Sequence, residues 1–173
     1  MNHDSYSDAY IGDILARSRT IAMVGASANP SRPSYFAMKY LRQKGFRVIP
    51  VNPGQAGKEI LGEKVYASLD AIGEKVDIVD IFRASDSALD VTRDAIKIGA
   101  KVVWMQLGVR NVEAARLAEE AGLQVVMNRC PKIEYGRLSG ELGWAGVNSR
   151  RLSAKRPLLA PKGVQHRVLG VKA

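Results

Sequence analysis

Cys130 is the strongest candidate nucleophile in this sequence. Arg129 and Lys132 flank it, and nearby cations favour the reactive thiolate form of a cysteine. A catalytic cysteine also needs an orienting base, but the two histidines, His3 and His166, lie near the ends of the chain. Because no orienting base is found, an unreactive loop cysteine is favoured. With one cysteine and two distant histidines, the sequence excludes a Cys/His zinc site.

A second candidate site is a phosphate-binding turn at Gly25. An apolar run ends at Gly25, and a polar loop with Arg32 leads to helical periodicity, with Ser34 as a possible helix cap. Free N–H groups at a helix start bind anions, and an arginine adds a charged fork. The remaining glycines of the dinucleotide fingerprint G-x-G-x-x-G are absent, and Asn52 stands where NAD-binding proteins carry a carboxylate. The pattern disfavours an NAD dehydrogenase and is compatible with a ligand that carries extra phosphate, near which Lys58 could supply positive charge.

Five apolar runs alternate with helical periodicity, which is typical of a parallel sheet built from βαβ units. We expect an α/β, Rossmann-like open sheet of five strands in the order 3-2-1-4-5, with helices on both faces. Pro50 within the second run indicates an edge or an irregular position. A leading helix is expected within the first 18 residues, started by Ser7 or Asp8, and a short helix around Leu69 and Ile72. The strands are expected at residues 20–24, 46–51, 76–82, 101–106 and 123–127, and further helices at 36–41, 89–96 and 114–121.

Ligands of open parallel sheets bind beyond the carboxyl ends of the strands. This rule selects five loops as the candidate site: Gly25–Ser34, Asn52–Lys58, Phe82–Asp86, Gln106–Asn111 and Asn128–Ile133. Next to them, Asp77 and Asp80 fall on a strand that we expect to be buried. One of them should be held by backbone N–H groups or by Arg83, rather than serve as a general base. We expect Trp104 to lie in the core, and Tyr135 and Trp144 to pack rather than to stack on a ligand.

The charge of the chain is concentrated at its C-terminus. Lysine and arginine number 26 against 17 acidic residues, a net charge of +9, and residues 150–173 hold seven of the basic residues and no acid. The sequence therefore predicts one domain over residues 1–150 and a basic tail over residues 151–173. Because no apolar stretch is long enough to span a membrane and no signal peptide is visible, a cytoplasmic protein is expected.

Several of these loops together resemble the stand-alone CoA-binding proteins of bacteria. These proteins are similar to the N-terminal CoA-binding domain of the succinyl-CoA synthetase alpha subunit. The resemblance covers about residues 10–150 and excludes the basic tail. It rests on the runs at residues 21–27, 32–34, 48–53, 79–83, 103–108 and 128–134.

The resemblance implies a Rossmann-type fold that binds coenzyme A across the carboxyl edge of the sheet. Gly25, Ala26 and Ser27 would approach the CoA diphosphate, with Arg32 near a phosphate, and Phe82 and Arg83 would flank the adenosine. The remaining implied positions are Asn52, Pro53, Lys58, Gln106, Gly108, Asn128 and Cys130. Lys58 comes later than the lysine of the synthetase loop, and an arginine is inserted into the synthetase's Asn-Cys-Pro turn.

The preferred interpretation is a CoA or acyl-CoA binding protein rather than an enzyme. Ligase activity does not carry over, because the chain has no room for the synthetase's second domain. Acyl transfer or thiol chemistry at Cys130 is the alternative. An NAD(P)-dependent oxidoreductase and nucleic-acid binding through the basic tail are less favoured, and a homo-oligomer stays open.

Overall fold

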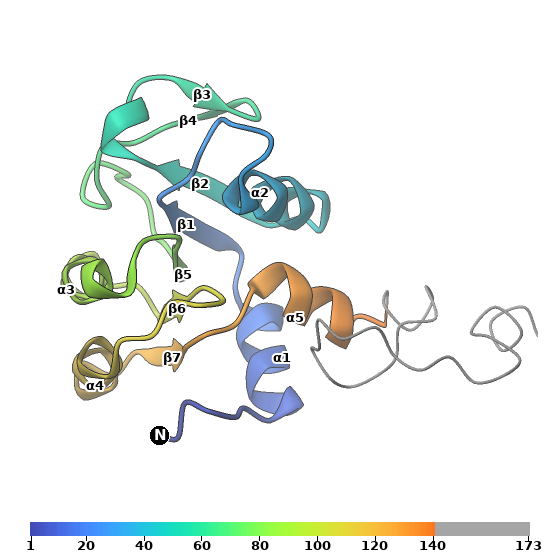
Figure 1. Ribbon diagram of the computed structural model, residues 1–173, viewed down its shortest axis with the longest axis vertical. Helices are drawn as coiled ribbons and strands as arrows, with labels where there is room; N and C mark the ends of the chain where they lie inside the picture. Colours follow the sequence, from blue (N-terminus) through green and yellow to red (C-terminus); the bar gives the residue numbers. More distant parts are fainter. Residues whose placement is uncertain (141–173) are drawn as a thin grey trace, which may run out of the picture. The chain divides into compact units, whose positions relative to one another are not determined.

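A parallel sheet of five strands organises the protein (Figure 1). The computed structural model describes residues 1–140. Each expected strand is present, and its hydrophobic run is buried on both faces, as helix-covered parallel sheets require. The α/β Rossmann-like fold predicted from the sequence is thereby confirmed. The strands are β1 (Thr20–Val24), β2 (Arg47–Val51), β5 (Ile78–Ile81), β6 (Val102–Met105) and β7 (Gln124–Val126).

The chain divides into two compact units, Met1–Lys132 and Ile133–Ala173. The first contains the whole sheet. Of the second, the structure describes the end of helix α5 (Pro131–Leu138), where Arg137 bonds Glu134 at 2.7 Å. Trp144 and the basic tail over residues 151–173 lie outside the described residues, so the predicted domain boundary stays a prediction. No helix within residues 1–140 is long and apolar enough to cross a membrane.

The strand order differs from the predicted 3-2-1-4-5. The sheet runs β2-β1-β5-β6-β7, so the third long strand lies beside the first instead of beyond the second. The place beyond β2 is taken by Tyr66, which forms a single parallel bridge to Val51. Tyr66 N–H donates to the Pro50 carbonyl at 3.0 Å, and its own carbonyl accepts from Asn52 N–H at 2.9 Å. Pro50 therefore occupies the edge strand of the five, as its missing N–H required.

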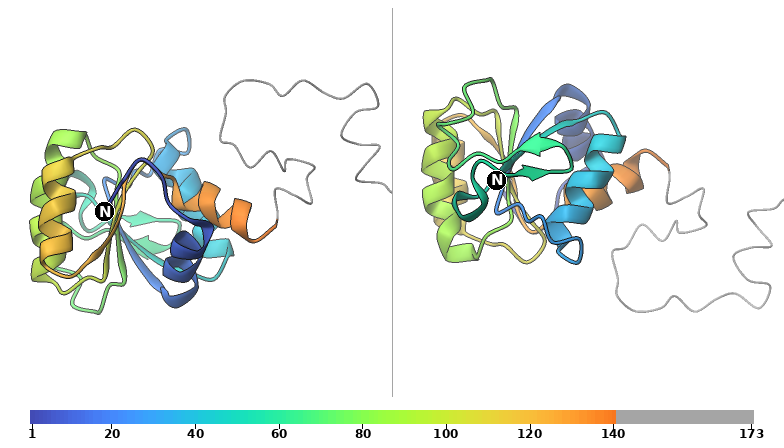
Figure 2. Two further views of the ribbon diagram at one scale, coloured as in Figure 1. Left: turned by 90° about the horizontal axis from the view of Figure 1, so that it is seen from below. Right: turned by 90° about the horizontal axis from the view of Figure 1, so that it is seen from above.

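Helices cover the sheet on both sides (Figure 2). The alanine-rich faces of α3 (Ala88–Lys97) and α4 (Val112–Glu120) pack on one face, around Ala22, Val79 and Val103. Helices α1 (Asp8–Arg17) and α2 (Pro33–Gln43) lie on the opposite side. The expected helix around residues 69–72 is wrong: both apolar residues are buried, but they close a turn in which Ile72 N–H donates to the Leu69 carbonyl.

The outer edge of β7 is covered by the start of the chain. Ser7 caps α1, as predicted, by accepting a hydrogen bond from Tyr10 N–H at 3.2 Å. The Tyr10 hydroxyl bonds both the N–H and the carbonyl of Val125 at 3.2 Å, and the Tyr6 hydroxyl accepts from Met127 N–H at 2.7 Å. Two phenol groups thus replace a neighbouring strand. We call residues 1–7 the N-terminal strap.

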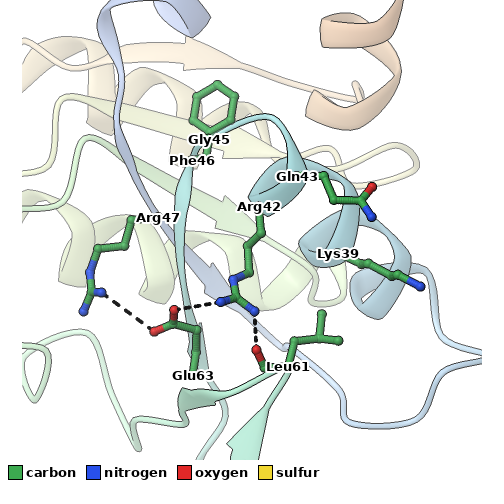
Figure 3. A pocket seen from close by; sticks show the side chains of 8 residues that line it. All are labelled: Lys39, Arg42, Gln43, Gly45, Phe46, Arg47, Leu61 and Glu63. Carbon is green, nitrogen blue, oxygen red and sulfur yellow. Dashed lines mark hydrogen bonds and ion pairs between the residues drawn. The ribbon is translucent and has the colours of Figure 1, made fainter.

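A short hairpin, β3 (Glu59–Ile60) and β4 (Glu63–Lys64), follows β2 and carries a strained residue at its tip. Leu61 and Gly62 form the two-residue turn with φ of 51° and 77°. This left-handed conformation suits glycine and asparagine and disfavours leucine. Arg42 of α2 donates to the Leu61 carbonyl and to Glu63, which fixes the turn in place (Figure 3).

Replacing Leu61 by asparagine is expected to stabilise the protein by about 0.5–1 kcal/mol, because asparagine adopts the left-handed conformation at lower cost. Urea unfolding at neutral pH measures the change. Leu61→Ala is the control, since alanine has the same backbone preference as leucine and should give no gain. An Asn variant no more stable than the wild type would show that the turn is not strained.

Candidate functional site

The carboxyl ends of the five strands bring all the sequence-predicted site residues to one edge of the sheet. They leave the strands in five loops, after β1, β2, β5, β6 and β7. The strand order reverses between β1 and β5. From β1 the chain adds β2 on one side of β1, and it then returns to add β5, β6 and β7 on the opposite side of β1. A ligand of this fold class binds at such a switch point. The residues are Gly25, Ala26, Ser27 and Arg32; Asn52, Pro53 and Lys58; Phe82 and Arg83; Gln106 and Gly108; and Asn128 and Cys130.

At the switch point the backbone of Gly25 lies very close to the end of the neighbouring strand β5. Gly25 has φ of 91°, and a Cβ atom there would lie 2.3 Å from the Phe82 carbonyl oxygen and 3.0 Å from the Arg83 side chain. Its N–H donates to the Val51 carbonyl at 2.9 Å, and Phe82 N–H donates to Val24 at 2.8 Å. Only glycine fits this crossing. The structure therefore joins the turns after β1, β2 and β5 at one point.

Asn52 fastens the loop after β2 to the loop after β1. Its Nδ2 donates to the Ala26 carbonyl at 2.8 Å, and its Oδ1 accepts from Gly54 N–H at 3.0 Å in the 3₁₀ turn Pro53–Gln55. Gln55 adds a second link, accepting from Ala28 N–H at 3.2 Å. The position where NAD-binding proteins carry a ribose-binding carboxylate thus holds an amide that is engaged with the protein itself.

The start of α2 is open to an anion. Arg32 is the N-cap residue and makes no capping hydrogen bond, Pro33 is the first helical residue, and no acidic side chain lies in the first turn. The predicted cap at Ser34 is wrong: the fixed φ of Pro33 suits the first helical position, so the N-cap is Arg32, two residues before the predicted one, and Ser34 is buried within the helix. Pro33 has no N–H, and the N–H groups of Arg32 and Tyr35 bond the carbonyls of Asn29 and Arg32 at 3.0 Å, so the helix dipole and the charge of Arg32 are what favour a negative ligand here.

Exposed cations surround this edge. Arg32 precedes α2, Lys58 follows the 3₁₀ turn, Arg83 follows β5, and Arg110 follows β6. The backbone of Lys58 bonds Gln55 and Val65, which places it beyond the turn that Asn52 fixes. Phosphate groups are the natural partners of such a set.

Asp80 and Gln106 form a buried pair behind the loop after β6. Gln106 Nε2 donates to both carboxyl oxygens of Asp80 at 3.1 Å, and Gln106 Oε1 accepts from Leu107 N–H at 3.3 Å. Asp80 is wholly buried, and loss of water raises its pKa to about 8. A pairing of Asp80 with Arg83, one of the expected alternatives, does not form. The other expected alternative was a carboxylate held by backbone N–H groups. Asp77 is held in this way, because it accepts from the N–H groups of Arg19 and Thr20 at 2.8 and 3.1 Å.

The loops after β6 and β7 are joined by Asn128. This residue has φ of 56°, and its Oδ1 accepts from Gly108 N–H at 2.7 Å. Trp104 is in the core, as predicted, and its indole N–H donates to the Arg129 carbonyl at 2.8 Å. Cys130 is partly exposed and directly precedes α5. The cysteine therefore lies at the ligand edge on a loop fixed from two sides.

Sequence reasoning missed the residues that tie the middle loops together. Ser85 Oγ accepts from Arg110 N–H at 3.0 Å, and the Ser85 carbonyl accepts from Asn111 Nδ2 at 3.0 Å. Asn111 also caps α4 by accepting from Ala114 N–H at 2.9 Å. An asparagine three residues before a helical alanine is a recognisable capping signal. Nothing in the sequence marked Ser85.

A hollow of about 530 Å³ lies elsewhere (Figure 3). Gly45, Phe46 and Arg47 at the start of β2 line it, together with the end of α2 and the hairpin. It therefore opens at the amino end of a strand. Its arginines are engaged by carboxylates: Arg42 and Arg47 both contact Glu63, at 3.2 and 3.8 Å.

Comparison with known proteins identifies the family. The family described as CoA binding domain matches residues 19–136, which include every strand of the sheet. The chain belongs to this CoA binding domain family. The Bacillus subtilis protein YneT, described as uncharacterized, is 39% identical to this chain over 129 residues, which are 75% of this chain and 94% of YneT.

Solved structures agree with the family assignment. A hypothetical protein from Pyrococcus horikoshii is 44% identical with a TM-score of 0.76, covering 81% of this chain and 97% of the other. A Thermus thermophilus protein is 39% identical with a TM-score of 0.74, covering 77% and 99%. The dinucleotide-forming acetyl-coenzyme A synthetase 1 of Ca. Korarchaeum cryptofilum is 30% identical with a TM-score of 0.55, and the match spans 63% of this chain but 26% of that enzyme. This CoA binding domain is thus similar both to small proteins and to one part of a synthetase.

Proposed function

We propose that the protein binds coenzyme A or an acyl-CoA across the carboxyl edge of the sheet. The observation that carries the proposal is the family match over the entire sheet, residues 19–136. Gly25 at the switch point supports it, because its missing side chain lets the turn after β1 lie against the Phe82 carbonyl, which keeps the loops after β1 and β5 together at the position where ligands of this fold class bind. The positive end of the α2 dipole and exposed Arg32 supply charge for phosphate.

From their side-chain contacts we propose two roles for the predicted site residues. We assign ligand contact to the residues of the turn after β1 and to exposed or half-buried Arg32, Lys58, Phe82 and Arg83. Asn52, Gln106 and Asn128 use their side chains to hold the loops, so we assign them to positioning. Asn52 in place of a ribose-binding carboxylate favours CoA over NAD. We also assign to the ligand-facing loops the remaining members of the set, Pro53, Gly108 and Cys130.

Calorimetric titration with CoA, NAD and NADP tests the proposal. We expect CoA to bind and NAD to produce no signal. Binding of NAD with no response to CoA would overturn the proposal. Incubation with acetyl-CoA followed by mass spectrometry tests the alternative of acyl transfer, which requires an adduct on Cys130.

Lys58→Gln is expected to weaken CoA binding by about threefold to tenfold, because one phosphate-directed charge is lost at a partly desolvated edge. Lys39→Gln is the matched control: this lysine is also exposed, but it lines the hollow at the amino end of β2. If the two variants bind CoA with equal affinity, Lys58 is not part of the CoA site.

A further inference from the structure

The N-terminal strap reaches from the edge of β7 to two loops of the candidate site. The Asp4 carboxylate forms an ion pair of 2.5 Å with Arg110, in the loop after β6. The Asp4 carbonyl accepts a hydrogen bond of 3.1 Å from Arg129, in the loop after β7. The Arg129 guanidinium also lies 5.6 Å from the centre of the Tyr6 ring. An acidic residue from the start of the chain is therefore held between two cations of the ligand edge.

The strap remains attached independently of Asp4. Tyr6 is fixed by Met127 N–H and by His3 at 2.9 Å, and the terminal amino group contacts Glu119 at 3.1 Å. The Asp4–Arg110 pair itself is exposed, with 76% of the Asp4 side chain and 45% of the Arg110 side chain accessible. An exposed ion pair contributes little free energy and is readily exchanged for another. The carboxylate can thus be replaced on Arg110 without release of the strap.

Arg110 is displaced along the edge from the turn proposed for the diphosphate. In the order β1-β5-β6, two strand spacings separate the ends of β1 and β6, about 10 Å. A ligand whose diphosphate lies at Gly25 would therefore bring a different part of itself to Arg110. The group that replaces a carboxylate on an arginine is itself anionic. Within the CoA class, the candidates are the 3′-phosphate and a carboxylate on the acyl group.

We infer that Arg110 is an anchor for an anionic group of the ligand other than the diphosphate, and that Asp4 occupies this anchor while the site is empty. The inference rests on the proposed function, because it takes the ligand from the CoA class. It gives the strap a regulatory role: the Asp4 carboxylate competes with the ligand for Arg110. The Asp4 carboxylate therefore lowers the affinity only for ligands that carry an anionic group able to bind Arg110.

Titrations of the full chain with four ligands test the inference. CoA against dephospho-CoA isolates the 3′-phosphate, and succinyl-CoA against acetyl-CoA isolates an acyl carboxylate. For the ligand with the matching group, Asp4→Asn is expected to tighten binding about twofold to fivefold, and Arg110→Gln to weaken it similarly. In the double variant the Asp4 effect should vanish. Asp13→Asn, which breaks an exposed pair with Arg17 on α1, is the control and should change nothing.

Asp4→Asn affinities equal to or weaker than wild type for all four ligands would overturn the inference. Amide exchange at Met127 provides a second measurement, because its N–H is bonded to Tyr6. Unchanged exchange in Asp4→Asn supports direct competition, whereas faster exchange would mean that the strap has detached and would overturn it. A wild-type protein that binds none of the four ligands would instead refute the proposed function.

Discussion

Gly25→Ala is expected to destabilise the protein by about 4 kcal/mol, which is most of the stability of a domain at the lower end of the usual range of about 5–15 kcal/mol. Two penalties combine: a side chain at φ of 91°, and a Cβ atom 2.3 Å from the Phe82 carbonyl oxygen. The clash is with the backbone directly after the central strand β5, so movement of a flexible side chain cannot relieve it. Urea unfolding monitored by circular dichroism measures the loss.

Gly45→Ala separates the two penalties of the glycine substitution. Gly45 has nearly the same φ, 90°, but a Cβ there would meet nothing within 4 Å. It should cost only about 1–2 kcal/mol, from the backbone alone. If both variants lose equal stability, the close approach of the turns after β1 and β5 is not as tight as described.

The stability of the protein is expected to fall as the pH rises from about 5 to 8, because of Asp80. Burial raises the pKa of this carboxyl from an ordinary 3.8 to about 8. The folded protein then holds a proton that the unfolded chain releases above pH 4. The stabilisation is complete below the unfolded pKa and is lost as the pH approaches 8, with a slope of up to about 1.4 kcal/mol per pH unit. Urea unfolding at each pH measures the slope.

Asp80→Asn should remove this contribution. Asparagine is neutral at every pH and its oxygen still accepts from Gln106, so the variant should be the more stable protein at pH 8 and similar at pH 5. His3 has a pKa lowered chiefly by burial, which adds a slope of opposite sign below pH 6.5. That slope is common to both proteins and cancels in the comparison. Parallel pH profiles for the two proteins would contradict the assignment.

The sequence predicted the strands because hydrophobic runs such as 20–24 and 102–105 are strong signals. The predicted strand order was wrong because of one short segment beside β2. A single bridge from Tyr66 fills the place beyond β2, and one paired residue leaves no periodic pattern to detect. The turn around Leu69 and Ile72 failed similarly, since two buried residues spaced by three fit a helix or a compact turn equally well.

The sequence places the candidate residues at one edge of the sheet, but it does not give the contacts of their side chains. The loops follow from the rule that parallel strands end at one edge, and Gly25 from its place after an apolar run. The side-chain directions of Asn52, Gln106 and Asn128 depend on which backbone groups the neighbouring loops present, which spacing does not encode. The tie from Asp4 to Arg110 spans 106 residues and lies beyond any local pattern.

The phenol groups along β7 also bear on edge-to-edge pairing between molecules of this protein. An uncovered outer strand offers a row of donors and acceptors on which another chain can add and begin aggregation. Here Tyr6 and Tyr10 already occupy those groups at Val125 and Met127. By occupying these backbone groups, Tyr6 and Tyr10 are expected to protect this edge of the sheet from aggregation by strand addition.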